Sequence, residues 1–106
     1  MSDPLGKEPR AYETDHKLVN DFASDMFEKL RKNAHKAHWN TVDQSWLLGR
    51  LKVEVEELSN AINHTPSEII QECADVANFA AMIADNARKA CNQYGRHLDS
   101  TVKEID

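Results

Sequence analysis

Two pairs of acidic residues in the 106-residue sequence share a three-residue spacing. The first pair is Glu54 and Glu57, and the second is Glu72 and Asp75. Residues three apart lie on the same face of a helix, so each pair presents two carboxylates together. Oxygen ligands of this kind suit Mg²⁺ or Mn²⁺, whose octahedral preference leaves positions for water and phosphate oxygens. The spacing therefore predicts a carboxylate site for divalent cations.

The second pair interrupts a segment that is otherwise apolar. Of the 16 residues from Ile69 to Ala84, 12 are Ile, Cys, Ala, Val, Phe or Met. The four exceptions are Gln71, Glu72, Asp75 and Asn78. At about 100° per residue they gather within roughly a third of the helix circumference. A buried carboxylate without a partner costs several kcal/mol or takes up a proton, so this polar sector requires cations, hydrogen-bond donors or water.

A purely structural interpretation of the four carboxylates stays open. Glu54 and Glu57 also fit the solvated face of an amphipathic helix. Glu72 and Asp75 also fit ion pairs with a structural Arg or Lys. Glu56 lies on the opposite flank of its helix from Glu57, and we expect it on the surface.

Charge and cysteine usage narrow the class of protein. With 13 Lys and Arg against 18 Asp and Glu the net charge is -5, which disfavours nucleic acid or an anionic membrane as the main partner. Cys73 and Cys91 form no CxxC pattern, which is typical of a reduced, cytoplasmic protein. No uninterrupted apolar run approaches the roughly 20 residues of a membrane span. We therefore expect a soluble cytoplasmic protein with no membrane partner.

The elements that position the carboxylates are helices. Residues 1–14 contain two of the three prolines and no hydrophobic period, which predicts a mobile arm before one domain over residues 15–106. With Asp15 as cap, the first helix is expected to run from His16 to about His35. Its apolar stripe consists of Leu18, Val19, Phe22, Met26, Phe27 and Leu30.

Two further helices follow. Thr41 or Asp43 can cap a second helix whose bundle-facing seam is Leu48, Leu51, Val55, Leu58 and Ile62. In the third helix, expected to end near Asn92, Thr65 is the N-cap, Pro66 the first helical residue and Glu68 part of a capping box. The final RHLDSTVKEID either forms a short fourth helix or frays.

This order of elements predicts an all-α fold, a small antiparallel helical bundle with a short turn between the second and third helices. Such a turn brings the two acidic pairs face to face. Three helices cannot cover every side of residues 69–84. We therefore expect a homo-oligomer, either a dimer or a dimer of dimers.

The segments LLGRLKVEVEELSNAI and SEIIQECADVANFAAMIAD together resemble the MazG-like all-α nucleoside triphosphate pyrophosphohydrolases, which carry E-x-x-E, a spacer and E-x-x-D. With the upstream MFEKLRKNAHKAHWN, the resemblance covers roughly Phe22 to Asp85. It implies Mg²⁺-dependent hydrolysis, with Mn²⁺ as a substitute, of a ribo- or deoxynucleoside triphosphate to the monophosphate and pyrophosphate. Glu54, Glu57, Glu72 and Asp75 would be the catalytic metal ligands, and one Glu would also orient the attacking water.

The resemblance also implies a substrate site in the loop beside the metal cleft. His38 or Trp39 would stack on the base, and Asn78 would hydrogen-bond the sugar or a phosphate. Lys36, with Lys32 and Arg50, would offset phosphate charge. Each of these residues has a structural alternative. Trp39 and Trp46 could instead pack in the core, and Phe79 could lie either in the core or in the base pocket. His38 could be a helix cap, and the lysines could lie at solvated helix ends. Asn78 could be a satisfied polar group inside the bundle.

Two positions depart from the family pattern. Many members carry a further Glu directly before the first ligand, where this chain has Val53. Many also carry a basic segment on a following helix, for which this chain offers only NARKACNQYGR.

The sequence has features of three other functions. A di-iron bundle requires two inward Glu-x-x-His pairs, and the only such spacing is Glu13 with His16. A zinc site at His35 and His38 lacks further nitrogen or sulfur ligands nearby. A non-catalytic helical interaction module, with its carboxylates paired to Lys or Arg across a dimer interface, is the main alternative.

Overall fold

The computed structural model describes residues 4–6 and 8–93, and within them the chain is all-helical, with three α-helices, one 3-10 helix and no strand. The helices are α1 (Tyr12–Lys32), α2 (Gln44–Ala61) and α3 (Pro66–Gln93), and the 3-10 helix η1 spans Trp39–Thr41. None of the helices in this part of the chain has the length and apolarity that a bilayer span requires. The predicted C-terminal helix in RHLDSTVKEID lies outside the described residues.

The boundaries of α1 differ from the prediction at both ends. The helix begins at Tyr12, inside the segment predicted to be an arm, and its N-cap is Ala11. Asp15 lies in the first turn, where its negative charge interacts favourably with the helix dipole. It also forms an ion pair with Arg10 at 2.7 Å. The helix ends at Lys32 rather than near His35, because Asn33 leaves the helical conformation and its N–H closes the last turn.

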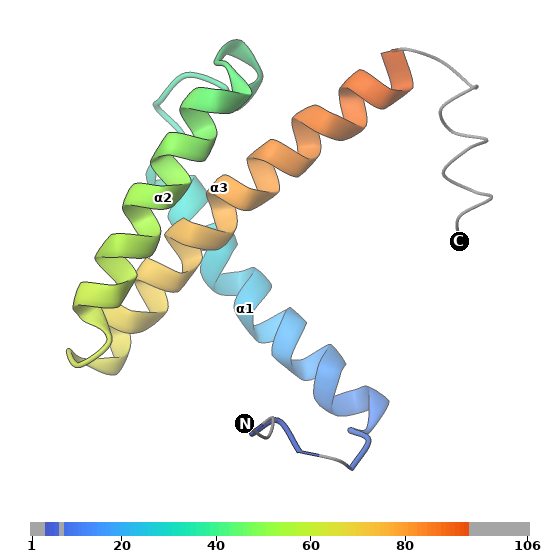
Figure 1. The fold of residues 1–106 in the computed structure, drawn as a ribbon, viewed down its shortest axis with the longest axis vertical. Helices are drawn as coiled ribbons and strands as arrows, with labels where there is room; N and C mark the ends of the chain where they lie inside the picture. Colours follow the sequence, from blue (N-terminus) through green and yellow to red (C-terminus); the bar gives the residue numbers. More distant parts are fainter. Residues whose placement is uncertain (1–3, 7, 94–106) are drawn as a thin grey trace.

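The starts of α2 and α3 follow the predicted caps. Asp43 is the N-cap of α2, and its carbonyl accepts the N–H groups of Trp46 and Leu47 at 3.1 Å. Thr65 caps α3, with its hydroxyl oxygen accepting the Glu68 N–H at 3.2 Å. The turn between Ala61 and Pro66 is short, so α2 and α3 form an antiparallel hairpin, as expected (Figure 1).

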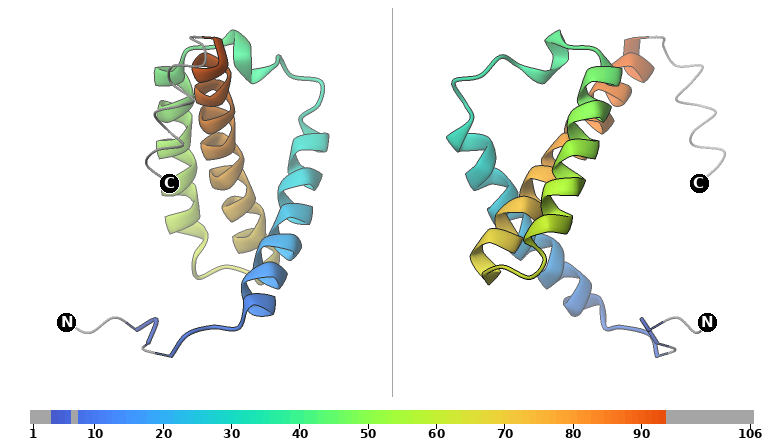
Figure 2. Two further views of the ribbon diagram at one scale, coloured as in Figure 1. Left: turned by 90° about the vertical axis from the view of Figure 1, so that its right-hand side faces the viewer. Right: turned by 60° about the vertical axis from the view of Figure 1, so that its left-hand side comes forward.

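The predicted bundle is realised only in part, because α1 does not lie alongside the hairpin. It crosses behind α3 in the view of Figure 1 and contacts α3 through its second half. Residues 12–21 are all exposed, including Leu18 and Val19 of the predicted apolar stripe. Phe27 is also exposed, whereas Phe22, Met26 and Leu30 are half-buried. From the end of α1, residues 33–43 arch over to the start of α2 (Figure 2).

The face of α2 that packs against α3 lies about one residue, or roughly 100°, around the helix from the predicted seam. The buried residues of α2 are Leu47, Glu54 and Ala61, which are seven residues apart. Leu51 and Leu58 of the predicted seam are half-buried, but Leu48, Val55 and Ile62 are exposed. The apolar surface of α2 is wider than one contact line, so periodicity alone did not identify which line α3 covers.

The hydrophobic core of the described residues is small. Its buried members are Leu47, Ala61 and Ala74. Although 12 of 16 residues from Ile69 to Ala84 are apolar, only Ala74 and Asn78 in that segment are buried. Of the other eleven apolar residues, eight are half-buried and three are exposed, so the described helices cover this apolar segment only in part.

Candidate carboxylate site

Glu54 is the most deeply buried carboxylate of the predicted set. Its residue is only 5% exposed, because it lies on the buried line of α2 between Leu47 and Ala61. Arg50, one turn earlier, donates to its carboxylate at 2.7 Å. Burial, followed by hydrogen bonding to Glu57 and the charges of Glu57 and Asp75, raises the pKa of Glu54 from 4.5 to about 7, although Arg50 acts in the opposite direction.

Three carboxylates meet between α2 and α3. Glu54, Glu57 and Glu72 each offer one oxygen, and these oxygens lie within 4.8 Å of one another. Glu57 is exposed and Glu72 is half-buried, so the cluster is open to solvent on the Glu57 side. The predicted meeting of the two acidic helix faces is therefore observed for three of the four residues.

Glu72 has an oxygen that no described residue satisfies. Its Oε2 is buried and has no hydrogen-bond partner in the described part of the chain. Burial and the charges of Asp75 and Glu57 raise the pKa of Glu72, and Lys29 partly opposes them. A buried carboxylate oxygen without a donor is costly unless a proton, water or cation meets it.

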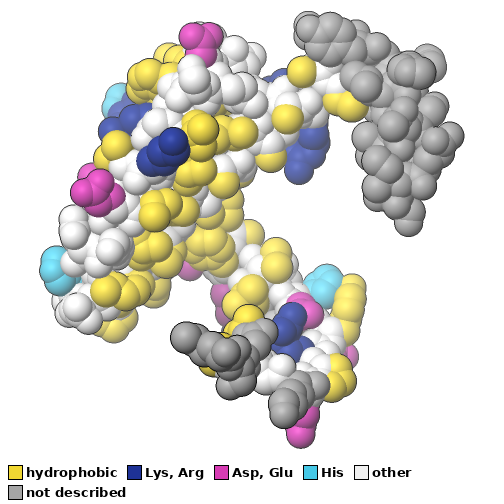
Figure 3. Space-filling view, viewed as in Figure 1, with side chains coloured by type: hydrophobic (Ala, Val, Ile, Leu, Met, Phe, Trp, Pro, Cys, Tyr) yellow, Lys and Arg dark blue, Asp and Glu magenta, His cyan; other side chains and the backbone are white. Residues whose placement is uncertain are grey.

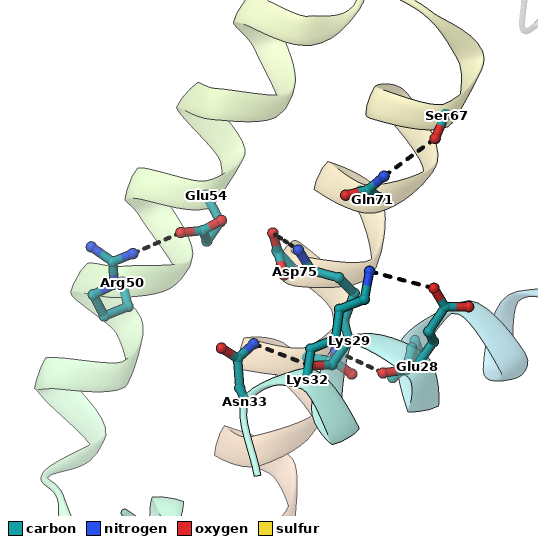
Figure 4. A network of polar contacts seen from close by, with 11 residues as sticks. Glu28, Lys29, Lys32, Asn33, Arg50, Glu54, Ser67, Gln71 and Asp75 are labelled. Atoms are coloured by element: carbon teal, nitrogen blue, oxygen red, sulfur yellow. Dashed lines mark hydrogen bonds and ion pairs between the residues drawn. The ribbon is translucent and has the colours of Figure 1, made fainter. Parts of the chain in front are cut away.

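Asp75 lies beside this cluster but is paired elsewhere. Its carboxylate contacts the Lys29 ammonium of α1 at 3.3 Å, and the two side chains are 18% and 21% exposed (Figure 4). Figure 4 shows Glu54 and Asp75 facing one another from α2 and α3, with Lys29 reaching in from α1. The negative charge of Asp75 nevertheless helps to raise the pKa of both Glu54 and Glu72.

Two of the four predicted carboxylates form ion pairs with Arg or Lys within one chain, which is the structural alternative to metal binding. Arg50 pairs with Glu54, and Lys29 pairs with Asp75. Arg50 was predicted to meet phosphate; instead its guanidinium bonds Glu54 and lies 5.8 Å from the Phe79 ring centroid. The role of Lys29 was not predicted, although its position beside the apolar residues Met26 and Leu30 indicates a cation that reaches inward.

The predicted base-binding loop is not adjacent to the cluster. The Trp39 indole N–H donates to Asp85 at 2.8 Å, and Asp85 is ten residues beyond Asp75, roughly 15 Å along the axis of α3. The Asn86 amide also donates to the Trp39 carbonyl at 3.3 Å. The resemblance placed this loop beside the metal cleft; the structure attaches it to the second half of α3.

Two side chains lie against the Trp39 ring. The His38 ring stacks on it with 4.2 Å between centroids, and the Lys89 ammonium lies 5.9 Å from its centroid. His38 also accepts the Asn40 N–H through Nδ1 at 3.1 Å, so it caps η1. Stacking of a base on the face that His38 covers would therefore displace the His38 ring.

The remaining predicted residues are dispersed. Lys36 is exposed in the turn after α1, Lys32 pairs with Glu28 at 3.5 Å, and Trp46 is 55% exposed rather than packed in the core. Asn78 is buried, and its amide donates to the Met26 carbonyl at 3.1 Å. Its Oδ1 is buried without a partner among the described residues.

Two open grooves flank α1 where it meets α3. One, of about 260 Å³, is lined by Leu30, Trp39, Asn78, Ala81, Met82, Asp85 and Arg88. The other, of about 360 Å³, is lined by Asp25, Glu28, Lys29, Ser67, Ile70, Gln71 and Ala74. The first brings Trp39 and Asn78 to one surface, one helical turn beyond Asp75.

The arrangement combines three converging carboxylates, a buried oxygen without a donor among the described residues, and two cationic side chains. Arg50 binds Glu54 of the cluster, and Lys29 binds the neighbouring Asp75. The donor set of the cluster is oxygen only, which suits a hard divalent cation. No family model matches the chain, and no curated protein or solved structure proved significantly similar to it.

Proposed function

We propose that the protein is a Mg²⁺-dependent pyrophosphohydrolase of ribo- or deoxynucleoside triphosphates, with Mn²⁺ as a possible replacement for Mg²⁺. The observation that carries the proposal is the convergence of Glu54, Glu57 and Glu72 within 4.8 Å. Their mutual repulsion and the unpartnered Glu72 oxygen favour a divalent cation between α2 and α3. Acidic clusters also occur without ions, so the pattern resembling MazG-like enzymes is a second support.

Each carboxylate has a distinct part in this proposal. Glu54, Glu57 and Glu72 would hold the ion. Asp75 would join them once its partner Lys29 leaves it, and the released Lys29 ammonium could then pair with a substrate phosphate. A bound divalent ion would neutralise phosphate charge and polarise the phosphoryl oxygens. We assign the orientation of water for in-line attack on the α-phosphorus to Glu57, because it is the solvent-exposed carboxylate of the cluster.

The groove that contains Trp39 and Asn78 is the proposed place for the sugar and base. The Asn78 Oδ1 lacks a donor, which favours a ligand hydroxyl or N–H there. His38 and Trp39 would stack on the base after a shift of the His38 ring, and Lys36 would approach the phosphates from the loop. The proposal includes a cytoplasmic homodimer or homotetramer and a role in nucleotide-pool control or removal of unwanted nucleotides.

The direct test is a pyrophosphate-release assay over canonical and modified ribo- and deoxynucleoside triphosphates with Mg²⁺, Mn²⁺ or chelator. The proposal predicts metal-dependent release of pyrophosphate and monophosphate in equal amounts, abolished in Glu57→Gln and Glu72→Gln. Glu56→Gln is the matched control, because Glu56 is exposed on α2 and is not part of the cluster. Absence of turnover across the panel would refute it.

A non-catalytic interaction module is the second candidate, favoured by the Arg50–Glu54 and Lys29–Asp75 pairs. In that case the carboxylates serve packing and need no ion. Thermal unfolding with and without Mg²⁺ or Mn²⁺ separates the two functions, because an ion bound only to the folded state raises the Tm. If the protein is an interaction module, Mg²⁺ or Mn²⁺ should not raise the Tm of the wild type above that of Glu57→Gln.

A further inference from the structure

The third face of α3 carries an apolar seam in heptad spacing. Its residues alternate steps of three and four: Ile70, Cys73, Ala77, Ala80, Ala84 and Ala87. α2 meets α3 on the side of Glu72 and Phe79, and α1 meets it on the side of Asp75 and Asn78. All six seam residues are half-buried or exposed, and Ile70, at the edge of the seam, also lines the groove beside α1. A heptad seam of this kind is typical of a helix that packs along a second helix.

α2 extends this apolar face. Leu48, Val55 and Ile62 are 45%, 48% and 56% exposed, and they lie roughly 100° around the helix from the buried line of α2. Because α2 and α3 are antiparallel, the corresponding rotation on α3 brings its seam to the same side of the hairpin. Figure 3 shows hydrophobic side chains gathered along this side, and Figure 1 shows α1 behind it. We name the α3 seam with these three residues the hairpin face.

The composition of the hairpin face favours a helix as its partner. Its nine residues are all apolar, and five of the six on α3 are Ala or Cys. Small side chains let two helix backbones approach closely, and the larger residues of α2 then cover the flanks of the contact. A net charge of -5 also disfavours an anionic surface as the partner.

The steps of three and four residues along the α3 seam have the same order in both directions. When two antiparallel helices share a heptad seam, the first apolar position of one faces the second apolar position of the other. In this chain Ile70 then meets Ala87 of the other copy, Cys73 meets Ala84, and Ala77 meets Ala80, with every contact occurring twice. This is the self-complementary pattern that a two-fold axis requires.

We propose that the hairpin face packs against the same face of a second copy of this chain, with α3 antiparallel to α3 across a two-fold axis. Two adjacent helices, each about 10 Å across and about 25 Å long, present a face of roughly 500 Å² in projection. Because side chains make the face uneven, its accessible surface exceeds this projection and approaches the roughly 800 Å² per partner that a stable dimer buries. The contact also covers a chain whose described core contains only Leu47, Ala61 and Ala74.

This interface is that of the homo-oligomer included in the proposed function. The interface depends on packing alone, so it is tested by measuring association, and a failed turnover assay would not affect it. The chemistry is likewise tested separately, by pyrophosphate release.

The first test introduces a charge at the centre of the seam. Ala80 is exposed in the single chain, so Ala80→Glu should leave the helical content of a monomer unchanged while opposing association. Analytical ultracentrifugation should show a dimer for the wild type and a monomer for Ala80→Glu. The matched control, Ala23→Glu on the exposed surface of α1, should remain a dimer. A monomeric wild type, or a dimer unaffected by Ala80→Glu, overturns the proposal.

The second test determines the register. In a Cys91→Ala background, Ala84→Cys should form a covalent dimer through Cys73 of the other copy when treated with a short thiol cross-linker. Asn60→Cys, exposed on α2 outside the hairpin face, should give far less covalent dimer under the same conditions. Equal cross-linking of the two variants, or none for Ala84→Cys, overturns the antiparallel pairing of α3.

Discussion

Lys29 of α1 and Asp75 of α3 form a 3.3 Å ion pair in which both side chains are about four-fifths buried. The pair connects the crossing helix to the carboxylate cluster. Lys29→Met keeps the aliphatic stem but leaves Asp75 without its cation near Glu54 and Glu72. We expect urea denaturation of the metal-free protein to show that the free energy of unfolding falls by about 1–3 kcal/mol. Lys32→Met, which breaks the exposed Lys32–Glu28 pair, should cost less than about 0.5 kcal/mol. Equal effects of the two substitutions would contradict the buried role of Lys29.

The raised pKa of Glu54 predicts how stability depends on pH. Because its pKa is about 7 in the folded state against an ordinary 4.5, the folded protein binds the extra proton between these values. This contribution is complete below about pH 4.5 and is lost as pH rises towards 7. As pH rises from 4.5 to 7 without metal, the wild type should therefore lose on the order of 2–3 kcal/mol in its free energy of unfolding relative to Glu54→Gln. A constant difference between the two proteins across the window would rule out the raised pKa.

Divalent-ion binding should show the opposite pH trend. A carboxylate must lose its proton to bind an ion, so Mg²⁺ or Mn²⁺ affinity should increase as pH rises through about 7. Isothermal titration calorimetry at pH 6 and pH 8 measures this change, and proton release at the lower pH is a second readout. Affinity that is the same at both pH values would show that Glu54 is not a ligand.

Glu57→Gln should abolish turnover without unfolding the protein. The substitution removes one ligand, and in the metal-free state it also removes a negative charge next to Glu54 and Glu72. The metal-free variant should therefore be at least as stable as the wild type in thermal unfolding, while kcat falls to background. Glu56→Gln should retain near-wild-type kcat. An active Glu57→Gln together with an inactive Glu56→Gln would show that the ligand assignment on α2 is wrong.

Trp39→Phe tests whether the loop is fastened to α3 through the indole. The substitution removes the donor to Asp85, whose pKa is lowered by its hydrogen bonds to Lys89 and to Trp39. NMR titration should show the pKa of Asp85 moving upward, and hydrogen exchange should become faster in residues 38–44. His38→Gln is a useful comparison, because it leaves the Trp39–Asp85 bond in place. Unchanged exchange in Trp39→Phe would mean that Gln44 and Asn86 hold the loop by themselves.

The sequence by itself determined the local elements of this protein. The Thr65–Pro66–Glu68 pattern located the start of α3, because a capping side chain and a proline act within one helical turn. The spacing of the acidic pairs placed Glu54, Glu57 and Glu72 on facing helices, because a short turn leaves consecutive helices few arrangements other than an antiparallel hairpin.

Contacts between distant segments were decided only by the tertiary structure. The period of α2 fits either the Leu47–Glu54–Ala61 line or the Leu48–Val55–Ile62 line, and only packing against α3 selects the first. Lys29 and Asp75 are 46 residues apart, as are Trp39 and Asp85. Neither pairing follows from helical periodicity, because that period describes one helix at a time. The crossing of α1 over α3 decides which side chains meet, since crossing geometry depends on the whole packed surface.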